Sequence, residues 1–146
     1  MLMQSRSKEG LSLRNQLGVE LMETYNTLND KSIAFFAKYG ITSQQYNVLA
    51  ILYLAGSMST SNILEWMFEK NAGVSRLVDR LVKKQLVVKK PNKTDKRLIV
   101  VSLTEKGRIV YENTLQNLKE LENNSKNLSD EEVEQLIKLL LKLKGE

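Results

Sequence analysis

The stretch that decides the fold is VSRLVDRLVKKQLVVKKPNKTDKRLIVVSLTEKG, residues 74–107. Its first part repeats apolar residues at i, i+3, i+4 and i+7, which is the spacing of one helix face. These residues are Val74, Leu77, Val78 and Leu81. The spacing predicts a helix over about residues 72–84 that buries this stripe. The opposite side of the helix is basic, and we expect it to face solvent.

The second part of the stretch predicts a β-hairpin. Residues 86–90 and 98–103 are rich in Val, Ile and Leu, which favour strands. Pro91 is the only proline and closes the first strand. Residues 91–97 are too many for a two-residue turn, so the hairpin has an extended tip. That tip carries the basic run NKTDKR.

Two helices are predicted at the start of the chain. Apolar residues spaced three or four apart favour a long helix over about residues 11–39, with Gly40 as its C-terminal cap. A second helix is predicted over residues 44–54, because its apolar residues keep the same period and Ser43 is a good N-cap.

A third, short helix leads to the decisive stretch. Ser59 or Thr60 can cap it, and it runs to about residue 68. Its inward face is predicted to carry Ile63, Leu64, Met67 and Phe68. A tight connection follows, in which Asn71 is a suitable N-cap for the helix that carries the buried stripe.

The chain ends in two further helices. Thr104 is predicted to cap a helix from residue 105 to about residue 123 or 124. Ser129 begins a capping box with the acidic residues that follow, and this opens the last helix. One chain has few partners for its broad apolar face, which favours a second copy of the chain over burial against the first helix. The apolar residues are Val133, Leu136, Ile137, Leu139, Leu140, Leu141 and Leu143.

The order of elements predicts a fold that is mainly α with a small β-hairpin. A short helix, a tight turn, a second helix and a hairpin form a winged helix-turn-helix, here with long N- and C-terminal dimerisation helices. We expect residues 1–39 and 108–146 to form the helical dimerisation region. Residues 40–107 are expected to form the winged helix-turn-helix DNA-binding region, within one intertwined domain.

The composition argues against several classes of function. The 146 residues contain no cysteine and no histidine, which removes disulfides, thiolate or histidine metal sites and the commonest general base. We therefore expect no enzyme activity, no metal and no cofactor. The N-terminus lacks the apolar segment of a leader peptide, and no run approaches the roughly 20 apolar residues of a membrane span. The sequence predicts a cytoplasmic protein with no membrane partner.

Charge is unevenly distributed along the chain. Residues 70–108 carry 12 Lys or Arg and 3 Asp or Glu, a net charge of +9, while the rest of the chain has a net charge of −4. A solvated surface is the plainer interpretation of any charged run. So sharp a contrast between segments instead favours a polyanion, and double-stranded DNA in particular. A helix fits the major groove, and a basic hairpin tip can reach the minor groove or the backbone.

The decisive stretch resembles the MarR family of bacterial transcription regulators. The matching parts are VSRLVDRL in the predicted recognition helix, Asp95-Lys96-Arg97 in the hairpin, and LTEKG at the start of the next helix. The order of helices agrees over nearly the whole chain. The family usually has Gly where this chain has Gln85, in the turn after the recognition helix, and a non-Gly residue at positive φ is disfavoured.

The resemblance implies a DNA-binding transcriptional regulator that represses from a palindromic operator and responds to a ligand. Members of the family are homodimers whose first and last helices interlock, and each subunit offers one winged motif to half of the operator. The resemblance also implies that Arg97 enters the minor groove and that Asp95 orients it. It implies a small-molecule effector, such as a phenolic compound, bound between the dimer helices and the winged motif.

The sequence leaves the ligand-binding residues unknown. Helical aromatic residues could line an effector pocket, but aromatics at helical spacing are mostly interior, so we expect them to pack in the core. They are Phe35, Phe36, Tyr46, Tyr53 and Trp66.

A set of polar residues is predicted to contact DNA, although each has a plainer interpretation as solvated charge or helix cap. Arg76 lies opposite the apolar stripe, and Arg can pair bidentately with guanine. Arg80 and Lys83 are expected to hold phosphates. Asp79 would be repelled by phosphate, so an ion pair with Arg76 or Lys83 is expected for it. The DNA-binding set is Ser59, Ser61, Gly73, Ser75, Arg76, Arg80, Lys83, Lys93, Asp95, Lys96 and Arg97.

A different class of function remains open at this point. Winged helices also serve as protein-interaction modules without sequence-specific DNA binding, since fold does not fix function. Such a module would bind no DNA from upstream of its own gene and would show weak salt dependence. The basic segment and the Asp-x-Arg hairpin argue against it.

Overall fold

The computed structural model describes residues 10–68 and 73–146. The described chain is mainly helical with one two-stranded hairpin, which confirms the predicted fold class. The elements in chain order are α2 (Leu13–Ala37), α3 (Ser43–Ala55), α4 (Thr60–Trp66), α5 (Val74–Lys83), β1 (Val87–Pro91), β2 (Ile99–Leu103), α6 (Glu105–Gln116), α7 (Lys119–Glu122), the 3-10 turn η1 (Asn123–Ser125) and α8 (Asp130–Lys144).

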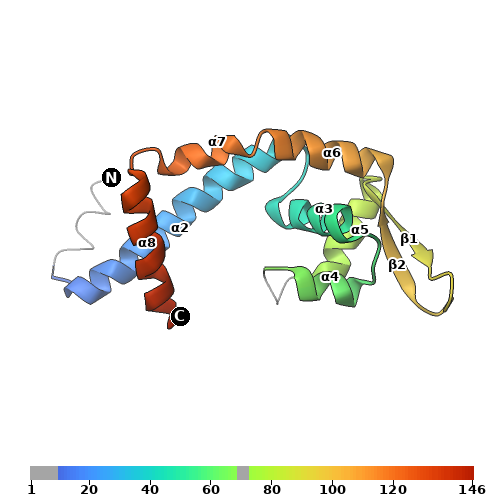
Figure 1. Cartoon of the computed structure of the whole chain (residues 1–146), viewed down its shortest axis with the longest axis horizontal. Helices are drawn as coiled ribbons and strands as arrows, with labels where there is room; N and C mark the ends of the chain where they lie inside the picture. Colours follow the sequence, from blue (N-terminus) through green and yellow to red (C-terminus); the bar gives the residue numbers. More distant parts are fainter. Residues whose placement is uncertain (1–9, 69–72) are drawn as a thin grey trace.

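The molecule is elongated, with the winged motif at one end (Figure 1). Helix α8, the C-terminus and the first turns of α2 lie at the other end, and α2, α6 and α7 span the distance between the two ends. α3 packs on α5 and α6, α4 packs on α5, and α2 packs on α7. Within the described ranges, no helix has the length and apolar content needed to cross a membrane.

The hydrophobic core lies in the winged motif and the helices directly against it. Every fully buried apolar side chain of the described residues falls between Phe35 and Tyr111. All four stripe residues of α5 are buried, as predicted: Val74, Leu77, Val78 and Leu81. The motif and the adjoining parts of α2 and α6 therefore form one core within a single chain.

The helical aromatic residues divide into two groups. Phe35, Phe36 and Tyr46 are buried, as expected, whereas Tyr53 and Trp66 are exposed. Tyr46 stacks on Tyr111 with ring centroids 5.4 Å apart. Burial raises the pKa of Tyr46 to about 12.

The start of α3 differs from the prediction. Thr42 is the N-cap, not Ser43, because Gln45 completes a reciprocal capping box with it. The Gln45 backbone N–H donates to Thr42 Oγ1 at 3.1 Å, and Gln45 Oε1 accepts from the Thr42 N–H at 3.2 Å. The preceding helix α2 already ends at Ala37, and Gly40 lies in the turn between the helices at φ +70°.

The region around α4 also needs correction. Ser59, one of the two predicted caps, begins the helix. α4 ends at Trp66 because Met67 adopts an extended backbone, and Phe68 then turns outward and is 91% exposed instead of inward-facing. The next helix, α5, has Gly73 as its N-cap, without a side-chain hydrogen bond. Asn71, the predicted cap, lies outside the described residues.

Helix α6 begins as predicted. The Thr104 side chain accepts a hydrogen bond from the Gly107 N–H at 3.0 Å. Gly107 must lack a side chain, since a Cβ there would lie 2.0 Å from the carbonyl oxygen of Leu86. The glycine of LTEKG thus allows the first turn of α6 to pack directly against the backbone that leads into β1.

The prediction of a single helix from residue 105 to about residue 123 or 124 is wrong. α6 ends at Gln116, and α7 begins at Lys119. Thr114 Oγ1 donates to the Val110 carbonyl at 2.7 Å, and Asn117 Nδ2 donates to the Asn113 carbonyl at 2.9 Å. Side chains bonded to the preceding turn in this way bend or end helices.

The turn before β1 holds Gln85 at φ +62°, the only positive φ of a non-glycine residue in the described chain. Its N–H donates to the Val82 carbonyl at 2.9 Å, and its carbonyl accepts from Thr104 Oγ1 at 2.7 Å. The turn keeps the backbone conformation that favours glycine. The departure at this position therefore adds local strain without changing the fold.

The hairpin has a third, short partner that the sequence did not reveal. β1 and β2 pair antiparallel, with Val87 opposite Leu103 and Pro91 opposite Ile99. Met58, in the connection between α3 and α4, pairs with Val101. The Met58 N–H donates to the Val101 carbonyl at 3.2 Å, and the Val101 N–H donates back at 2.8 Å.

Helix α8 opens with the predicted capping box, formed by Ser129 and Glu132. No α8 residue is buried in the described chain. Its large apolar side chains are 37% to 56% exposed: Leu136, Ile137, Leu139, Leu140, Leu141 and Leu143. α2 leaves a similar set exposed: Leu13, Leu17, Met22, Tyr25, Leu28 and Ile33.

Candidate nucleic-acid interface

The outward side of α5 carries the basic residues predicted for it. The stripe of this helix faces the core, and the positions between the stripe residues face solvent. The side chains of Arg76, Arg80 and Lys83 are all exposed. The sequence therefore places three cations on one accessible helix of a size that fits the major groove.

A hollow of about 400 Å³ lies between the start of α4 and the start of α5. Its polar lining includes four of the predicted residues: Ser61, Gly73, Ser75 and Arg76. Hydroxyl and guanidinium donors beside an open hollow suit a phosphate or a base edge. Ser59 does not line this hollow, and its hydroxyl accepts from the Asn62 N–H at 3.2 Å and caps α4.

The hairpin tip presents Arg97 to solvent with its side chain 90% exposed. The Asp95 carboxylate accepts hydrogen bonds from the Arg97 backbone N–H and Nε at 3.1 Å, and from Nη2 at 3.2 Å. These bonds hold the pKa of Asp95 below its ordinary value, so the carboxylate stays charged. Lys93 and Lys96 are exposed on the same tip.

Asp79 lies on α5, but its partner lies on the hairpin. Its carboxylate pairs with Lys89 of β1, not with Arg76 or Lys83 as predicted. Spacing along a helix identifies only neighbours on that helix, whereas β1 packs against α5 in the fold. The ion pair joins the recognition helix to the hairpin.

The base of the hairpin is fixed from its other side as well. The Met58–Val101 bridge ties β2 to the connection between α3 and α4. The hydroxyls of Ser57 and Ser102 lie 2.8 Å apart in the same region. The hairpin base is therefore joined to both neighbouring parts of the motif, while its tip projects.

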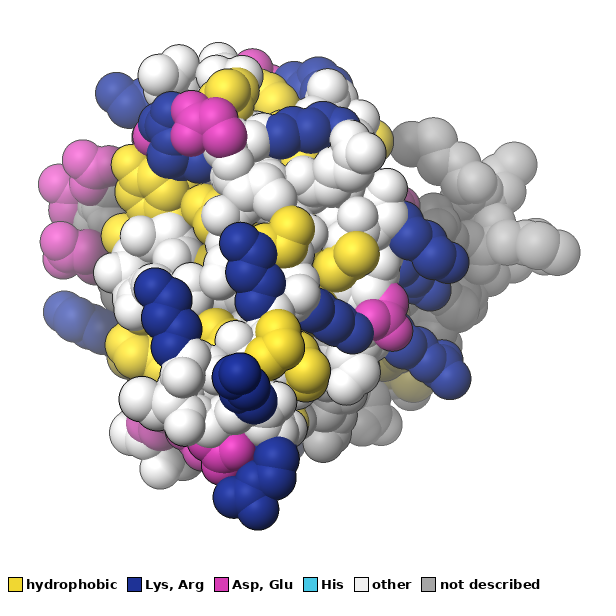
Figure 2. Space-filling view, turned by 90° about the vertical axis from the view of Figure 1, so that its right-hand side faces the viewer, with side chains coloured by type: hydrophobic (Ala, Val, Ile, Leu, Met, Phe, Trp, Pro, Cys, Tyr) yellow, Lys and Arg dark blue, Asp and Glu magenta, His cyan; other side chains and the backbone are white. Residues whose placement is uncertain are grey.

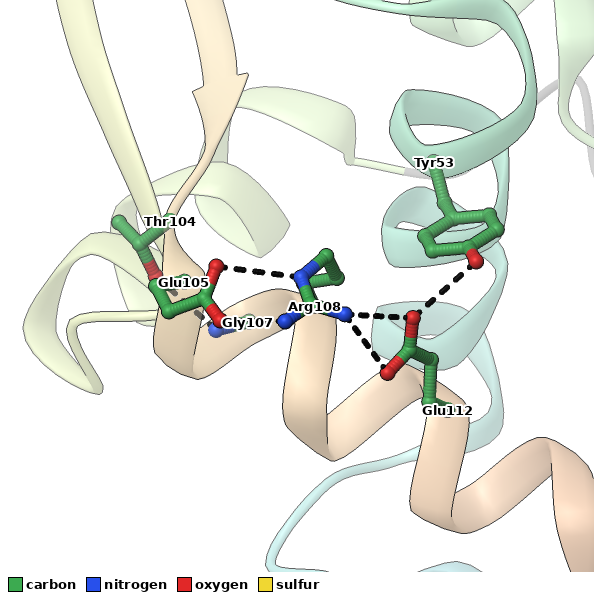
Figure 3. Close-up of polar contacts among 6 residues, drawn as sticks. All are labelled: Tyr53, Thr104, Glu105, Gly107, Arg108 and Glu112. Carbon is green, nitrogen blue, oxygen red and sulfur yellow. Dashed lines mark hydrogen bonds and ion pairs between the residues drawn. The ribbon is translucent and has the colours of Figure 1, made fainter.

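The start of α6 carries a polar cluster that was not predicted from the sequence (Figure 3). Arg108 Nη1 donates to the Glu112 carboxylate at 2.7 and 2.9 Å, and Nε donates to Glu105 at 3.1 Å. The Tyr53 hydroxyl of α3 donates to Glu112 at 3.1 Å. Spacings of three and four residues between these charges on one helix were the signal that could have revealed it.

This cluster has electrostatic consequences for its members. Hydrogen bonds to Glu105 and Glu112 raise the pKa of Arg108 above its ordinary value, and Arg108 lowers the pKa of Glu105. The hydrogen bond to Glu112 raises the pKa of Tyr53. Arg108 therefore belongs to a link between α6 and α3, although it contributes to the basic charge of residues 70–108.

Seen from the hairpin end, the molecule has a basic face (Figure 2). Lys and Arg side chains are spread over the middle of this face, and Asp and Glu lie toward its margins. No group of three or more acidic side chains in the described ranges could hold a metal ion. The chemistry on this face is that of hydrogen-bond donors and cations, which suits a polyanion.

Comparisons with known proteins agree with this geometry. A model of the MarR family matches residues 41–99. The HTH-type transcriptional repressor MdtR of Bacillus subtilis (strain 168) is 32% identical over 108 residues, which are 74% of this chain and 70% of that protein. The HTH-type transcriptional regulator MhqR of the same organism is 27% identical over 126 residues, 86% of this chain and 87% of that protein. A mutant of MarR from E. coli, solved in complex with operator DNA, is similar with a TM-score of 0.76 and 28% identity, covering 91% of this chain and 99% of that chain.

Proposed function

The chain belongs to the MarR family of transcription regulators, and from this premise we propose that it is a ligand-responsive repressor that binds a palindromic operator as a homodimer. One observation carries the proposal. The exposed cations of α5 and the oriented guanidinium of Arg97 belong to a single motif whose parts are joined at the hairpin base. The relative named as a repressor supports repression, and the similar E. coli protein was solved with operator DNA.

The proposed division of the chain separates the winged motif from the long helices at its two ends, although Phe35, Phe36 and Tyr111 of those helices pack in the core of the motif. Residues 1–39 and 108–146 form the dimerisation region, and residues 40–107 form the DNA-binding region. The exposed leucines of α8 make an apolar face that a second copy of the chain would cover. A two-fold dimer places its two recognition helices one DNA turn apart, about 34 Å.

On DNA, α5 lies in the major groove and the hairpin tip lies in the adjacent minor groove. Arg76 contacts base edges, while Arg80 and Lys83 hold phosphates. Ser61, Gly73 and Ser75 line the hollow beside Arg76 and donate to the backbone, and Ser59 orients the start of α4 as its cap. At the tip Arg97 enters the minor groove, Asp95 orients it, and Lys93 and Lys96 hold phosphates.

In this proposal an effector releases the protein from DNA by acting through the long helices. An inducer changes the angle or separation of the two winged motifs, so that both no longer fit one face of the DNA. The support is that α2 and α6 both contact α3, which connects the motif to the dimerisation region. Equal operator affinity of free and effector-bound protein would refute this step.

The test is fluorescence anisotropy with labelled DNA from directly upstream of the gene, in the presence of excess unrelated DNA and over a salt series. Wild type binds selectively, and binding weakens steeply with salt. Arg97→Ala weakens binding about tenfold or more, since a specific contact is worth about 1–3 kcal/mol. Lys126→Ala removes an exposed cation outside the motif and serves as the matched control.

The other outcomes are equally informative. Weak binding to any DNA that is indifferent to Arg97→Ala would reduce the basic face to a general polyanion surface. No DNA binding at all, with capture of a protein partner by the hairpin, would favour the interaction-module alternative.

A further inference from the structure

The carboxamide of Asn92 organises the backbone of the hairpin tip. Its Oδ1 accepts from the Thr94 backbone N–H at 2.8 Å, from the Thr94 hydroxyl at 2.6 Å, and from the Asp95 backbone N–H at 3.2 Å. The tip is closed behind it, because the Asn92 N–H donates to the Leu98 carbonyl at 2.7 Å. One side-chain oxygen therefore accepts hydrogen bonds from two residues in the middle of the basic tip, Thr94 and Asp95.

Asp95 links the ordered backbone at Asn92 to the side chain of Arg97. Its backbone is bonded to Asn92, and its carboxylate accepts all three hydrogen bonds from Arg97 described above. The Arg97 side chain is 90% exposed, so packing against the core does not fix its direction. The orientation of the guanidinium then depends on where the Asp95 carboxylate stands.

We propose that Asn92 is a positioning residue for DNA binding: its Oδ1 sets the backbone of Asp95, whose carboxylate aims the Arg97 guanidinium at the minor groove. The inference rests on the proposed function and adds to it a residue that acts through Asp95 and Arg97. Removing the oxygen deletes the three hydrogen bonds to Thr94 and Asp95. The guanidinium charge then stays in place but loses its preferred direction.

A competing explanation is a direct contact of Asn92 with DNA. Asn92 lines a hollow of about 440 Å³ at the hairpin, together with Ser57, Lys90 and Lys93. A direct contact would contribute to binding whether or not Arg97 is present. An effect that passes through Arg97 would disappear when Arg97 is removed, which is the outcome that a double-mutant cycle measures.

The first experiment uses the free protein and NMR of the Arg97 Nε–H group. Asn92→Ala should speed the exchange of this proton with water about fivefold or more, because the chain of hydrogen bonds that protects it is broken. Asn92→Asp keeps an acceptor oxygen and should restore slow exchange. Unchanged exchange in Asn92→Ala would overturn the proposal, and thermal melting of each variant shows that the fold is retained.

The second experiment measures operator binding for wild type, Asn92→Ala, Arg97→Ala and the double variant. Asn92→Ala should weaken binding about fivefold in the wild-type background and by less than about twofold in the Arg97→Ala background. Equal losses in both backgrounds would overturn the positioning role. If wild type itself binds no operator, the proposed function fails, and the NMR exchange rates alone then decide whether Asn92 orients Arg97.

Discussion

The winged motif and α8 use their apolar residues in opposite ways. In the motif, the stripe of α5 and the facing residues of α3 are buried within one chain. In α8, a capped and regular helix leaves six large apolar side chains at least 37% exposed and buries none of its residues in the described chain. Burial of apolar surface is the main source of folding stability. The motif can bury its apolar surface within one chain, whereas α8 cannot do so in the single chain. The motif is stabilised by intrachain packing, whereas we expect α8 to be stabilised by a second chain.

The largest expected effect is the loss of dimerisation when the apolar face of α8 is disrupted, and it tests the contrast between the motif and α8. Leu136→Lys with Leu140→Lys places two cations on the apolar face of α8. Dimerisation should weaken by about 3–6 kcal/mol, from about 1.5–3 kcal/mol for each leucine removed from an apolar contact. Sedimentation velocity over a concentration series measures the change in association.

The matched control is Glu134→Lys with Gln135→Lys, which adds two lysines at exposed polar positions of the same helix. It should leave the dimer intact. If the leucine variant stays dimeric, the second chain does not cover α8. If its winged motif also unfolds, the contrast between the two regions is wrong, because the motif would then depend on the dimer.

A smaller loss is expected from the core of the motif. Leu81→Ala empties a fully buried position of α5 and should lower the free energy of unfolding by about 2–5 kcal/mol. The neighbouring Val82 is 37% exposed, so Val82→Ala should cost much less. Chemical denaturation of the monomeric Leu136→Lys/Leu140→Lys background isolates the motif from association. Equal costs at the two positions would contradict the buried stripe.

The smallest expected effect is an increase in the free energy of unfolding. Gln85→Gly removes the strain of a non-glycine residue at φ +62° and should raise the free energy of unfolding by about 1 kcal/mol. Gln85→Ala keeps a Cβ and should give no gain. Association through α8 should be unchanged, because Gln85 lies in the motif. A Gln85→Gly variant no more stable than wild type would show that the turn carries no strain.

The sequence predicted the elements well where a local rule governs them. Period and capping chemistry identified the stripe of α5 and the starts at Thr104 and Ser129, because these depend on residues within a few positions of one another. The break at Asn117 was missed because apolar spacing continues across it to Leu118 and Leu121. Side-chain hydrogen bonds to the preceding turn decide that break, and the apolar pattern does not report them.

In the candidate site, too, features that depend on nearby residues could be predicted, and contacts between distant elements could not. The identity of the basic residues on α5 and at the tip could be predicted from type and position. The local pair of Asp95 and Arg97 was also expected, from the family resemblance. The contacts that join α5 and the hairpin to other elements could not be predicted: Lys89 pairs with Asp79, and Val101 pairs with Met58. Such pairs join segments whose distance in the chain carries no signal of contact. The Asn92 turn is local, and an Asx residue before a turn was a signal that could have been read.

The bonded hairpin tip also bears on the speed of binding. Ordering a flexible residue costs roughly 1–2 kcal/mol of conformational entropy. The backbone around Asn92, Thr94 and Asp95 is already ordered in the free chain, so that cost falls on folding and not on the encounter with DNA. No disorder-to-order step then has to precede docking of the tip. Both binding surfaces are then preorganised before they meet. The association rate constant is set by electrostatic steering and therefore depends on ionic strength.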